Sequence, residues 1–290
     1  MGRIDDALRR EGTRRAEPSA LNAVGADIFV SPWAAGDDVE PGSALGSSPR
    51  LRVVPSSLIN GFNPEWRERL TISTETDPML AHQFRRLAAV LLQAQRRGRV
   101  KSVMITSAAP HDGKTLTSLN LAGVLSGSYR LRVLLIEADL RRPAIAATIN
   151  LQPRDGLSAA LKASEDRKVP LIQLSDTLTL LPAGRPDPDP LSGLTSPRMQ
   201  RLLQDATEQF DWVIVDTPPL GATADAGLLS PLVDAVVLVI RARQTACAAV
   251  HTAVETLGRE RILGVVLNGV DRVNAAGYEA GYGYGDYSNA

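Results

Sequence analysis

The chain has 290 residues, which is enough for one large domain or two smaller ones. Its 32 basic and 32 acidic residues balance to a formal net charge of +0, which argues against a general nucleic-acid binder. One cysteine, Cys247, excludes a disulfide framework, disfavours a cysteine-based metal site and is typical of a reducing compartment. No apolar run has the length of a membrane-spanning helix, and the first ten residues lack the apolar core of a signal peptide. We therefore expect a soluble cytoplasmic protein that reaches a membrane only through a partner.

The two ends of the chain differ in composition from its middle. Residues 12–64 are rich in Gly, Pro, Ser and Ala without a sustained period, so we expect residues 1–69 to form a flexible N-terminal segment. Within it, residues 3–11 are either a short amphipathic helix or a frayed polar terminus. The Gly-rich residues 277–290 are expected to be a mobile tail, and they hold four of the five tyrosines, Tyr278, Tyr282, Tyr284 and Tyr287.

Between these ends, residues 70–276 alternate between strand and helix patterns. The predicted strands are 102–106, 132–136, 178–181, 212–215, 235–240 and 262–267, and the predicted helices are 79–95, 114–126, 192–209 and 245–257. Several of the strands are continuous apolar runs, which is typical of strands buried on both faces of a parallel sheet. The pattern predicts an α/β domain with a mostly parallel sheet and helices on both faces.

A loop ending in Gly113-Lys114-Thr115 joins the strand at 102–106 to the helix at 114–126. In a P-loop of this kind, backbone N–H groups of the loop and of the helix N-terminus cradle phosphates. The lysine reaches the outer phosphates, and the threonine hydroxyl ligates Mg²⁺. The expected nucleotide-binding residues are Ala109, Pro110, His111, Asp112, Gly113, Lys114, Thr115 and Leu116.

Two acidic motifs follow predicted strands. Glu137 and Asp139 stand after the strand at 132–136, where they either hold Mg²⁺ and accept a proton from an attacking hydroxyl or form a solvated turn. Asp216 ends the strand at 212–215, as a Walker B acid that orients Mg²⁺ does. Asn268, at the end of the last predicted strand, is either an adenine contact or an ordinary turn asparagine. Ligands of such sheets bind at the carboxyl ends of the strands, so these residues are expected to meet there.

These motifs together resemble the bacterial tyrosine kinase (BY-kinase) family, whose members act in capsule and exopolysaccharide synthesis and export. The similar stretches are the loop at 108–115, Val133 to Pro143 and Asp211 to Pro219, with further likeness in the Pro-rich loop at 184–190 and the tyrosine-rich C-terminus. The resemblance covers about residues 70–290. Plasmid-partition ATPases share the architecture but carry a signature lysine where this chain has Ala109.

The resemblance implies a P-loop kinase that uses ATP and Mg²⁺. It implies a Walker A motif with Lys114 and Thr115, a Walker A′ motif with Glu137 and Asp139, and Walker B Asp216. The catalytic residues would be Lys114, Glu137, Asp139 and Asp216, and the metal ligands Thr115, Glu137 and Asp216. It also implies tyrosine autophosphorylation of the tail in trans between copies, and a membrane activator of the chain-length-determinant type as partner.

The sequence departs from the family pattern at three places. The first acid of the Walker A′ motif is usually Asp, and here it is Glu137; His111-Asp112 replaces a Gly-acid pair. The oligomerisation motif of the family would fall on His82, Arg85 and Ala88, and only the arginine is retained. Two other functions therefore stay open: a P-loop ATPase switch without tyrosine kinase activity, and a non-catalytic regulator of the export complex.

Overall fold

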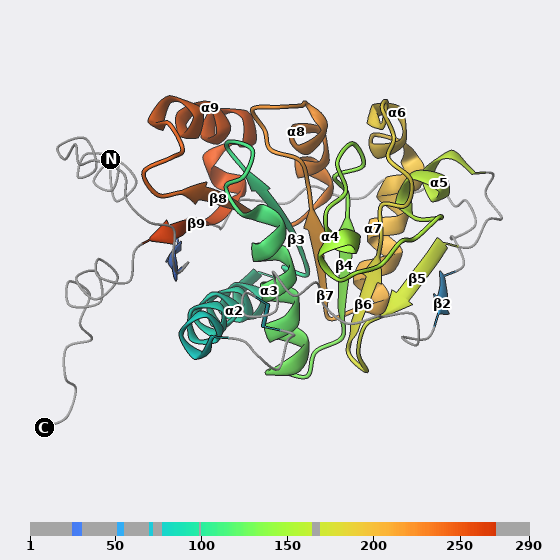
Figure 1. Cartoon of the computed structure of the whole chain (residues 1–290), viewed down its shortest axis with the longest axis horizontal. Helices are drawn as coiled ribbons and strands as arrows, with labels where there is room; N and C mark the ends of the chain where they lie inside the picture. The colour runs from blue at the N-terminus through green and yellow to red at the C-terminus, as the bar shows by residue number, and fades with distance from the viewer. Residues whose placement is uncertain are drawn as a thin grey trace, which may run out of the picture.

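One mixed sheet, in the order β1-β9-β8-β3-β7-β4-β6-β5-β2, forms the centre of the molecule (Figure 1). The computed structural model describes residues 25–30, 51–54, 70, 71, 77–98, 100–163 and 169–270. The strands are β1 (Gly25–Val30), β2 (Leu51–Val54), β3 (Ser102–Ser107), β4 (Val133–Glu137), β5 (Val169–Gln173), β6 (Leu178–Leu181), β7 (Trp212–Asp216), β8 (Ala235–Arg241) and β9 (Ile262–Val270).

Helices connect most of these strands. They are α2 (Pro78–Gly98), α3 (Lys114–Gly127), α4 (Ile145–Thr148), α5 (Leu157–Lys162), α6 (Leu191–Leu194), α7 (Pro197–Gln209), α8 (Asp225–Leu229) and α9 (Cys247–Leu257). Single 3₁₀ turns at Ser230–Leu232 and Arg259–Arg261 precede β8 and β9. The strand order β9-β8-β3-β7-β4-β6 is parallel throughout, so the carboxyl ends of these six strands lie along one edge of the sheet.

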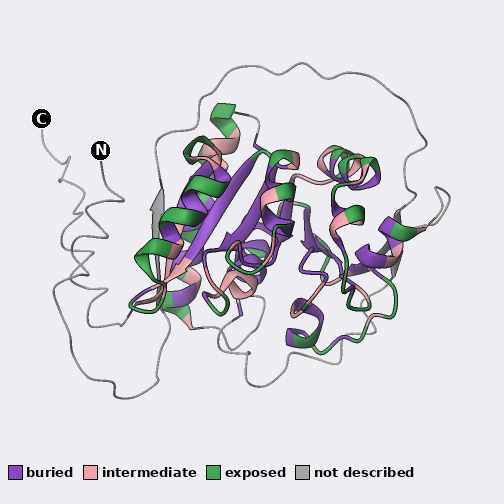
Figure 2. Ribbon diagram, turned by 90° about the horizontal axis from the view of Figure 1, so that it is seen from above, coloured by how far each residue is buried: buried purple, intermediate pink, exposed green. Residues whose placement is uncertain are grey.

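The sheet is buried on both faces, because alternate side chains of its strands enter two different hydrophobic cores. In β3, Val103 and Ile105 pack with α2 and α3, whereas Met104 packs with α7 and α9 on the other face. Figure 2 shows the buried strands between helices whose outer sides are exposed. The α/β fold with helices on both faces is therefore confirmed, and the phosphate loop lies between β3 and α3, two elements packed in the core.

The six strands predicted from apolar runs are confirmed, with ends that differ from the prediction by at most three residues. The predicted helix at 192–209 is wrong as a single element, since α6 ends before Pro197 and α7 begins there. A proline ring clashes with the preceding turn of a helix interior but fits the first turn, and Ser196 caps the new helix by accepting a hydrogen bond from the Met199 N–H at 3.3 Å. β5, which contains Pro170, has no counterpart among the predicted strands.

Two strands at the edges of the sheet come from the segment that the sequence assigns to a flexible region, residues 1–69. β1 pairs antiparallel with β9, and β2 pairs parallel with β5. These ten residues are thus part of the sheet, because they satisfy the backbone groups of edge strands that lie far away in the sequence. The predicted helix at 3–11 and the tail at 277–290 lie outside the described residues.

Removal of a core side chain from α2 tests whether this helix is an integral part of the domain. Leu91 is 0% exposed in the core between α2, α3 and the sheet. Leu91→Ala is expected to lower the free energy of unfolding by about 2–5 kcal/mol, because it removes buried methyl groups and leaves a cavity. The exposed Gln93→Ala on the same helix is the control, measured by urea denaturation. A loss below about 1 kcal/mol for Leu91→Ala would contradict the observed packing.

Candidate nucleotide-binding site

The phosphate loop leads from β3 into α3 with two residues in the left-handed backbone region. His111 has φ 66° and Gly113 has φ 101°. A Cβ atom on Gly113 would lie 1.9 Å from Nδ2 of Asn268, so glycine is required there by both the backbone angle and the close approach of this side chain. At the tip, Pro110 and His111 are exposed, and Pro110 has no N–H to offer a phosphate.

Lys114 is the first residue of α3, and its ammonium group faces the Walker A′ motif. Its Nζ lies 3.2 Å from Oδ2 of Asp139 and 3.4 Å from Oγ1 of Thr115. The other Asp139 oxygen accepts a hydrogen bond from the Arg142 N–H at 3.1 Å, which holds the carboxylate in place. Two residues that the sequence separates by 25 positions are thus an ion pair, as expected for the lysine and an acid of one phosphate site. Leu116, in the first turn of α3, is half-buried and packs against the core beside the sheet.

Asp216 at the end of β7 is buried between two hydroxyl groups of α3. Thr115 Oγ1 donates to Asp216 Oδ2 at 2.9 Å, and Ser118 Oγ lies 2.9 Å from Oδ1. Burial raises the pKa of Asp216 to about 6, although Lys114 and the two hydroxyls favour the charged form. Ser118 is a site residue that the sequence analysis missed; its position three residues after Thr115 on the same face of a helix is the signal that points to it.

Carboxylate and hydroxyl oxygens are ligands that Mg²⁺ accepts, so Thr115 and Asp216 fit a magnesium ion at the N-terminus of α3.

Glu137 ends β4 beside Asp216, its register partner on β7, but its carboxylate is engaged elsewhere. Oε1 accepts the Ile145 N–H at 2.6 Å and Oε2 accepts the Ala183 N–H at 3.1 Å. Burial raises the pKa of Glu137, and these backbone donors oppose that effect. The side chain thus joins the start of α4 to the chain after β6. A role for Glu137 at the metal or in proton transfer competes with both hydrogen bonds.

Two residues that the sequence predicts to contact the nucleotide, Ala109 and Asn268, donate hydrogen bonds to Asp112 of the phosphate loop. The Ala109 N–H donates to Oδ2 of Asp112 at 2.8 Å, so this N–H already has an acceptor within the loop. Asn268 Nδ2 donates to the Asp112 carbonyl at 2.8 Å, and its Oδ1 accepts the Gly269 N–H. The structure therefore places Asn268 against the phosphate loop. The four tail tyrosines expected as phosphoacceptors lie outside the described residues.

An arginine of the Walker A′ loop connects three loops at the same edge of the sheet. Arg141 Nε lies 3.0 Å from Oδ2 of Asp225, the buried first residue of α8, and Nη2 lies 3.5 Å from Oδ1. Arg141 Nη1 also donates to the Pro188 carbonyl in the Pro-rich loop at 184–190. This ion pair fixes the chain after β4 relative to the chain after β7, on either side of the site.

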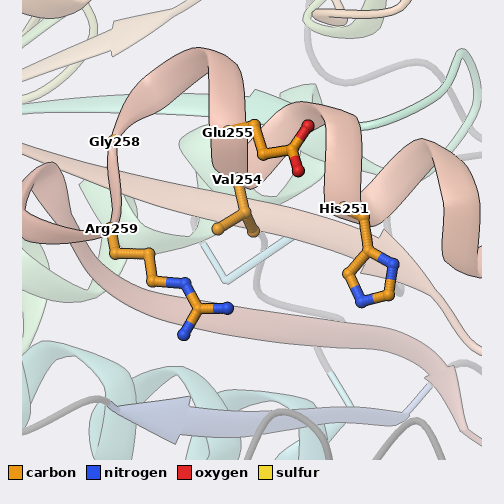
Figure 3. Close-up of a pocket in the computed structure, with 5 residues that line it drawn as sticks. All are labelled: His251, Val254, Glu255, Gly258 and Arg259. Atoms are coloured by element: carbon orange, nitrogen blue, oxygen red, sulfur yellow. The ribbon is translucent and has the colours of Figure 1, made fainter.

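A separate hollow of about 270 Å³ lies on α9. Its lining residues are His251, Val254, Glu255, Gly258 and Arg259 (Figure 3). The His251 ring and the Arg259 guanidinium point to the same side of the helix, with Val254 between them. None of these five residues belongs to the phosphate loop or to the acidic motifs.

Fold and site together define a P-loop α/β protein, a class that binds a nucleotide with a divalent metal ion. The chain is 36% identical over 199 residues to tyrosine-protein kinase YwqD of Bacillus subtilis, a match that covers 68% of this chain and 84% of the relative. It is 30% identical over 224 residues to tyrosine-protein kinase Wzc of Salmonella typhimurium, with 75% of this chain and 30% of the relative covered. The chain belongs to the bacterial tyrosine kinase family.

Solved structures agree with this assignment. The kinase domain of Escherichia coli tyrosine kinase ETK matches with a TM-score of 0.60 and 28% identity, over 73% of this chain and 80% of that chain. The VpsO kinase domain matches with a TM-score of 0.56 and 33% identity, over 64% of this chain and 94% of that chain. No family model matches the chain.

Relatives differ in how much of their length this chain represents. It spans 30% of Wzc and 25% of the succinoglycan biosynthesis transport protein ExoP of Rhizobium meliloti, to which it is 35% identical over 202 residues. Within the part of the chain that the structure describes, no helix combines the length and apolar character that crossing a membrane requires.

The raised pKa of Asp216 predicts how the free energy of unfolding of the nucleotide-free and metal-free protein depends on pH. The folded-state pKa, about 6, exceeds the unfolded value of 3.8, so the folded protein binds more protons than the unfolded chain between about pH 4 and 6. The contribution of this group to stability falls as the pH rises through that window. Asp216→Asn leaves no charge to bury, and its side-chain amide can still form hydrogen bonds with the hydroxyls of Thr115 and Ser118. It is expected to raise the free energy of unfolding at pH 8 by up to about 3 kcal/mol.

The measurement is urea denaturation of the metal-free protein from pH 4 to pH 8, with the exposed Asp176→Asn as control. The difference between Asp216→Asn and the wild type should grow between pH 4 and 6 and then level off. A difference that does not change with pH would contradict the raised pKa.

Proposed function

We propose that the chain is an ATP-dependent protein-tyrosine kinase that phosphorylates tail tyrosines of a neighbouring copy in trans. One observation carries the proposal: Lys114, Thr115, Asp139 and Asp216, drawn from three motifs, meet around the N-terminus of α3. A helix N-terminus with a lysine is suited to a polyphosphate, and the oxygen ligands beside it are suited to Mg²⁺. The family to which the chain belongs supports tyrosine as the acceptor.

Thr115 and Asp216 would hold Mg²⁺ with ATP. When bound, the metal ion neutralises negative charge on the phosphate oxygens. Lys114 would leave its ion pair with Asp139, in whole or in part, to contact the outer phosphates. The buried Asp216 would be drawn to its charged form by the cation, which reverses the effect of burial on its pKa.

In the transfer step the tyrosine oxygen forms a bond to the γ-phosphorus, and the bond from that phosphorus to the bridging oxygen of ADP breaks. The phenolic proton passes to a carboxylate as ADP departs. Asp139 is the better placed acceptor, because the move of Lys114 to the phosphates would release its Oδ2, whereas both oxygens of Glu137 accept backbone N–H groups. Glu137 would then act by holding the Walker A′ loop in position.

The acceptors would be Tyr278, Tyr282, Tyr284 and Tyr287, spaced by glycines that let each reach an active site of another copy. Each phosphate adds about −1.5 to −2 charges, so several on one tail repel each other and loosen an assembly of tails. We place this activity on the cytoplasmic side of a membrane, in exopolysaccharide synthesis and export. The partner would be a membrane activator of the chain-length-determinant type.

A P-loop ATPase switch is the second candidate, and the engagement of Glu137 favours it. If proton removal from tyrosine needs the first Walker A′ acid, two backbone hydrogen bonds at 2.6 and 3.1 Å would suppress it and leave water as the acceptor of the phosphoryl group.

Intact-mass spectrometry after incubation with Mg-ATP separates the two candidates. The kinase is expected to gain several phosphates of about 80 Da each, by simple mass of the added HPO₃ group. Lys114→Met should gain no phosphate, because it loses the ammonium group that contacts the outer phosphates. A chain without residues 277–290 should show only a small part of the mass increase. An unmodified wild type, incubated with its membrane activator and still releasing inorganic phosphate, would establish the ATPase and refute the kinase.

The two Walker A′ acids should respond differently to neutralisation. Asp139→Asn is expected to lower the rate of tyrosine phosphorylation by about 10²–10⁴-fold, as for loss of a general base, while its amide oxygen can still accept the Arg142 N–H. Glu137→Gln replaces a buried acceptor of backbone N–H groups and should lower the free energy of unfolding by about 1–3 kcal/mol. Rates and urea denaturation are measured for both variants. An inactive Glu137→Gln with wild-type stability would assign the base to Glu137.

A further inference from the structure

Three side chains hold the phosphate loop, Arg241 at the end of β8, Thr245 in the turn that follows it and Asn268 near the end of β9, and we call them the loop clamp. Thr245 Oγ1 donates to Oδ1 of Asp112 at 2.7 Å. Asn268 Nδ2 donates to the Asp112 carbonyl at 2.8 Å, and Arg241 Nη1 donates to the His111 carbonyl at 3.2 Å. The clamp thus reaches the loop from β8, β9 and the turn after β8, none of which carries a Walker motif.

Thr245 does not have the role that its place in the sequence favours. A threonine just before a helix commonly caps it by accepting a hydrogen bond from a backbone N–H of the first turn. Here α9 begins at Cys247, and its N-cap Ala246 makes no side-chain hydrogen bond. The Thr245 hydroxyl instead accepts the Arg241 N–H at 2.7 Å, so its single proton is directed to Asp112.

The clamp fixes the direction of the loop N–H groups. In a trans peptide unit, the carbonyl and the following N–H point to opposite sides. Hydrogen bonds to the carbonyls of His111 and Asp112 therefore orient the N–H groups of Asp112 and Gly113 away from Arg241 and Asn268. The left-handed angle of His111, φ 66°, is unfavourable for a residue with a Cβ atom and persists only when its surroundings hold it.

The carboxylate of Asp112 is the connection between Thr245 and the rest of the loop. It is buried, and its other oxygen accepts the Ala109 N–H at 2.8 Å, so it spans the loop from its start to its end. Burial raises the pKa of Asp112, whereas Thr245, Ala109, Arg241 and His111 favour its charged form. A carboxylate that could move freely would compete with phosphates for the loop N–H groups. Thr245 prevents this by its hydrogen bond to Oδ1 of Asp112.

We propose that Thr245 is a positioning residue for nucleotide binding, which acts through Asp112 to keep the phosphate loop in the shape that an anionic polyphosphate requires. The inference rests on the proposed function, because it assumes that this loop binds ATP. It goes beyond that function by assigning control of affinity to a residue outside the Walker motifs.

The experiment compares three variants of the full chain by calorimetric titration with Mg-ADP. Thr245→Val keeps the shape of the side chain and removes the hydroxyl, Thr245→Ser restores it, and Thr252→Val makes the same change on the exposed face of α9. We expect Thr245→Val to raise the Kd about tenfold, equivalent to about 1.4 kcal/mol, and the other two to stay within about twofold of the wild type. In tyrosine phosphorylation, Thr245→Val is expected to raise the KM for Mg-ATP about tenfold, whereas Thr252→Val keeps the wild-type KM.

Unchanged affinity in Thr245→Val, or equal weakening in Thr245→Ser, would overturn the inference while the proposed function stands. A wild type that binds no Mg-ADP would overturn both. If Thr245→Val fails to fold, as judged by circular dichroism, Thr245→Ala removes the same hydroxyl with less bulk and is held to the same outcomes.

Discussion

The buried carboxylate of Asp216 between two hydroxyls of α3 is the interaction on which the rest of the site depends. It joins the end of β7 to the first two turns of the helix that carries Lys114, so strand and helix cannot shift independently. Its charge is costly in this environment, as the pKa of about 6 shows. Two hydroxyl donors and a nearby ammonium group reduce that cost, and a cation would reduce it further. A buried carboxylate with a strongly raised pKa is more typical of a functional site than of a residue that serves only to pack the core.

Around Asp216, the loops at the carboxyl ends of the parallel strands bring side chains of opposite charge together. The Walker A′ loop after β4 supplies Asp139 to Lys114, and its Arg141 pairs with Asp225 at the start of α8. On the other side of β3, the clamp from β8 and β9 holds the phosphate loop by its carbonyls and by Asp112. The loop is therefore fixed from both sides, as electrostatic preorganisation of the proposed phosphate-binding donors would require.

Local sequence patterns predicted much of this arrangement, because apolar strand runs and the Gly-Lys-Thr turn are short-range signals. The six parallel strands and the approach of Lys114 to the Walker A′ acids follow from them. Glu137 shows the limit of such reasoning, since its spacing resembles that of a catalytic acid while its oxygens accept N–H groups from Ile145 and Ala183. Ala183 follows a different strand, so its distance from Glu137 is decided by strand order rather than by spacing. β1 and β2 were missed for a similar reason, because their partners are β9 and β5.

The sequence by itself determined the fold class, the family and the residue types that we propose for phosphate and metal binding, because each depends on motifs within a few residues of one another. Only the tertiary structure decided which other side chains contact these residues. Ser118 and Thr245 carry no motif of their own, yet their hydroxyls contact Asp216 and Asp112, residues about 100 and 130 positions away in the chain. A hydroxyl's partner is whatever acceptor packing brings within 3 Å, and the order β9-β8-β3-β7-β4 brings these acceptors there.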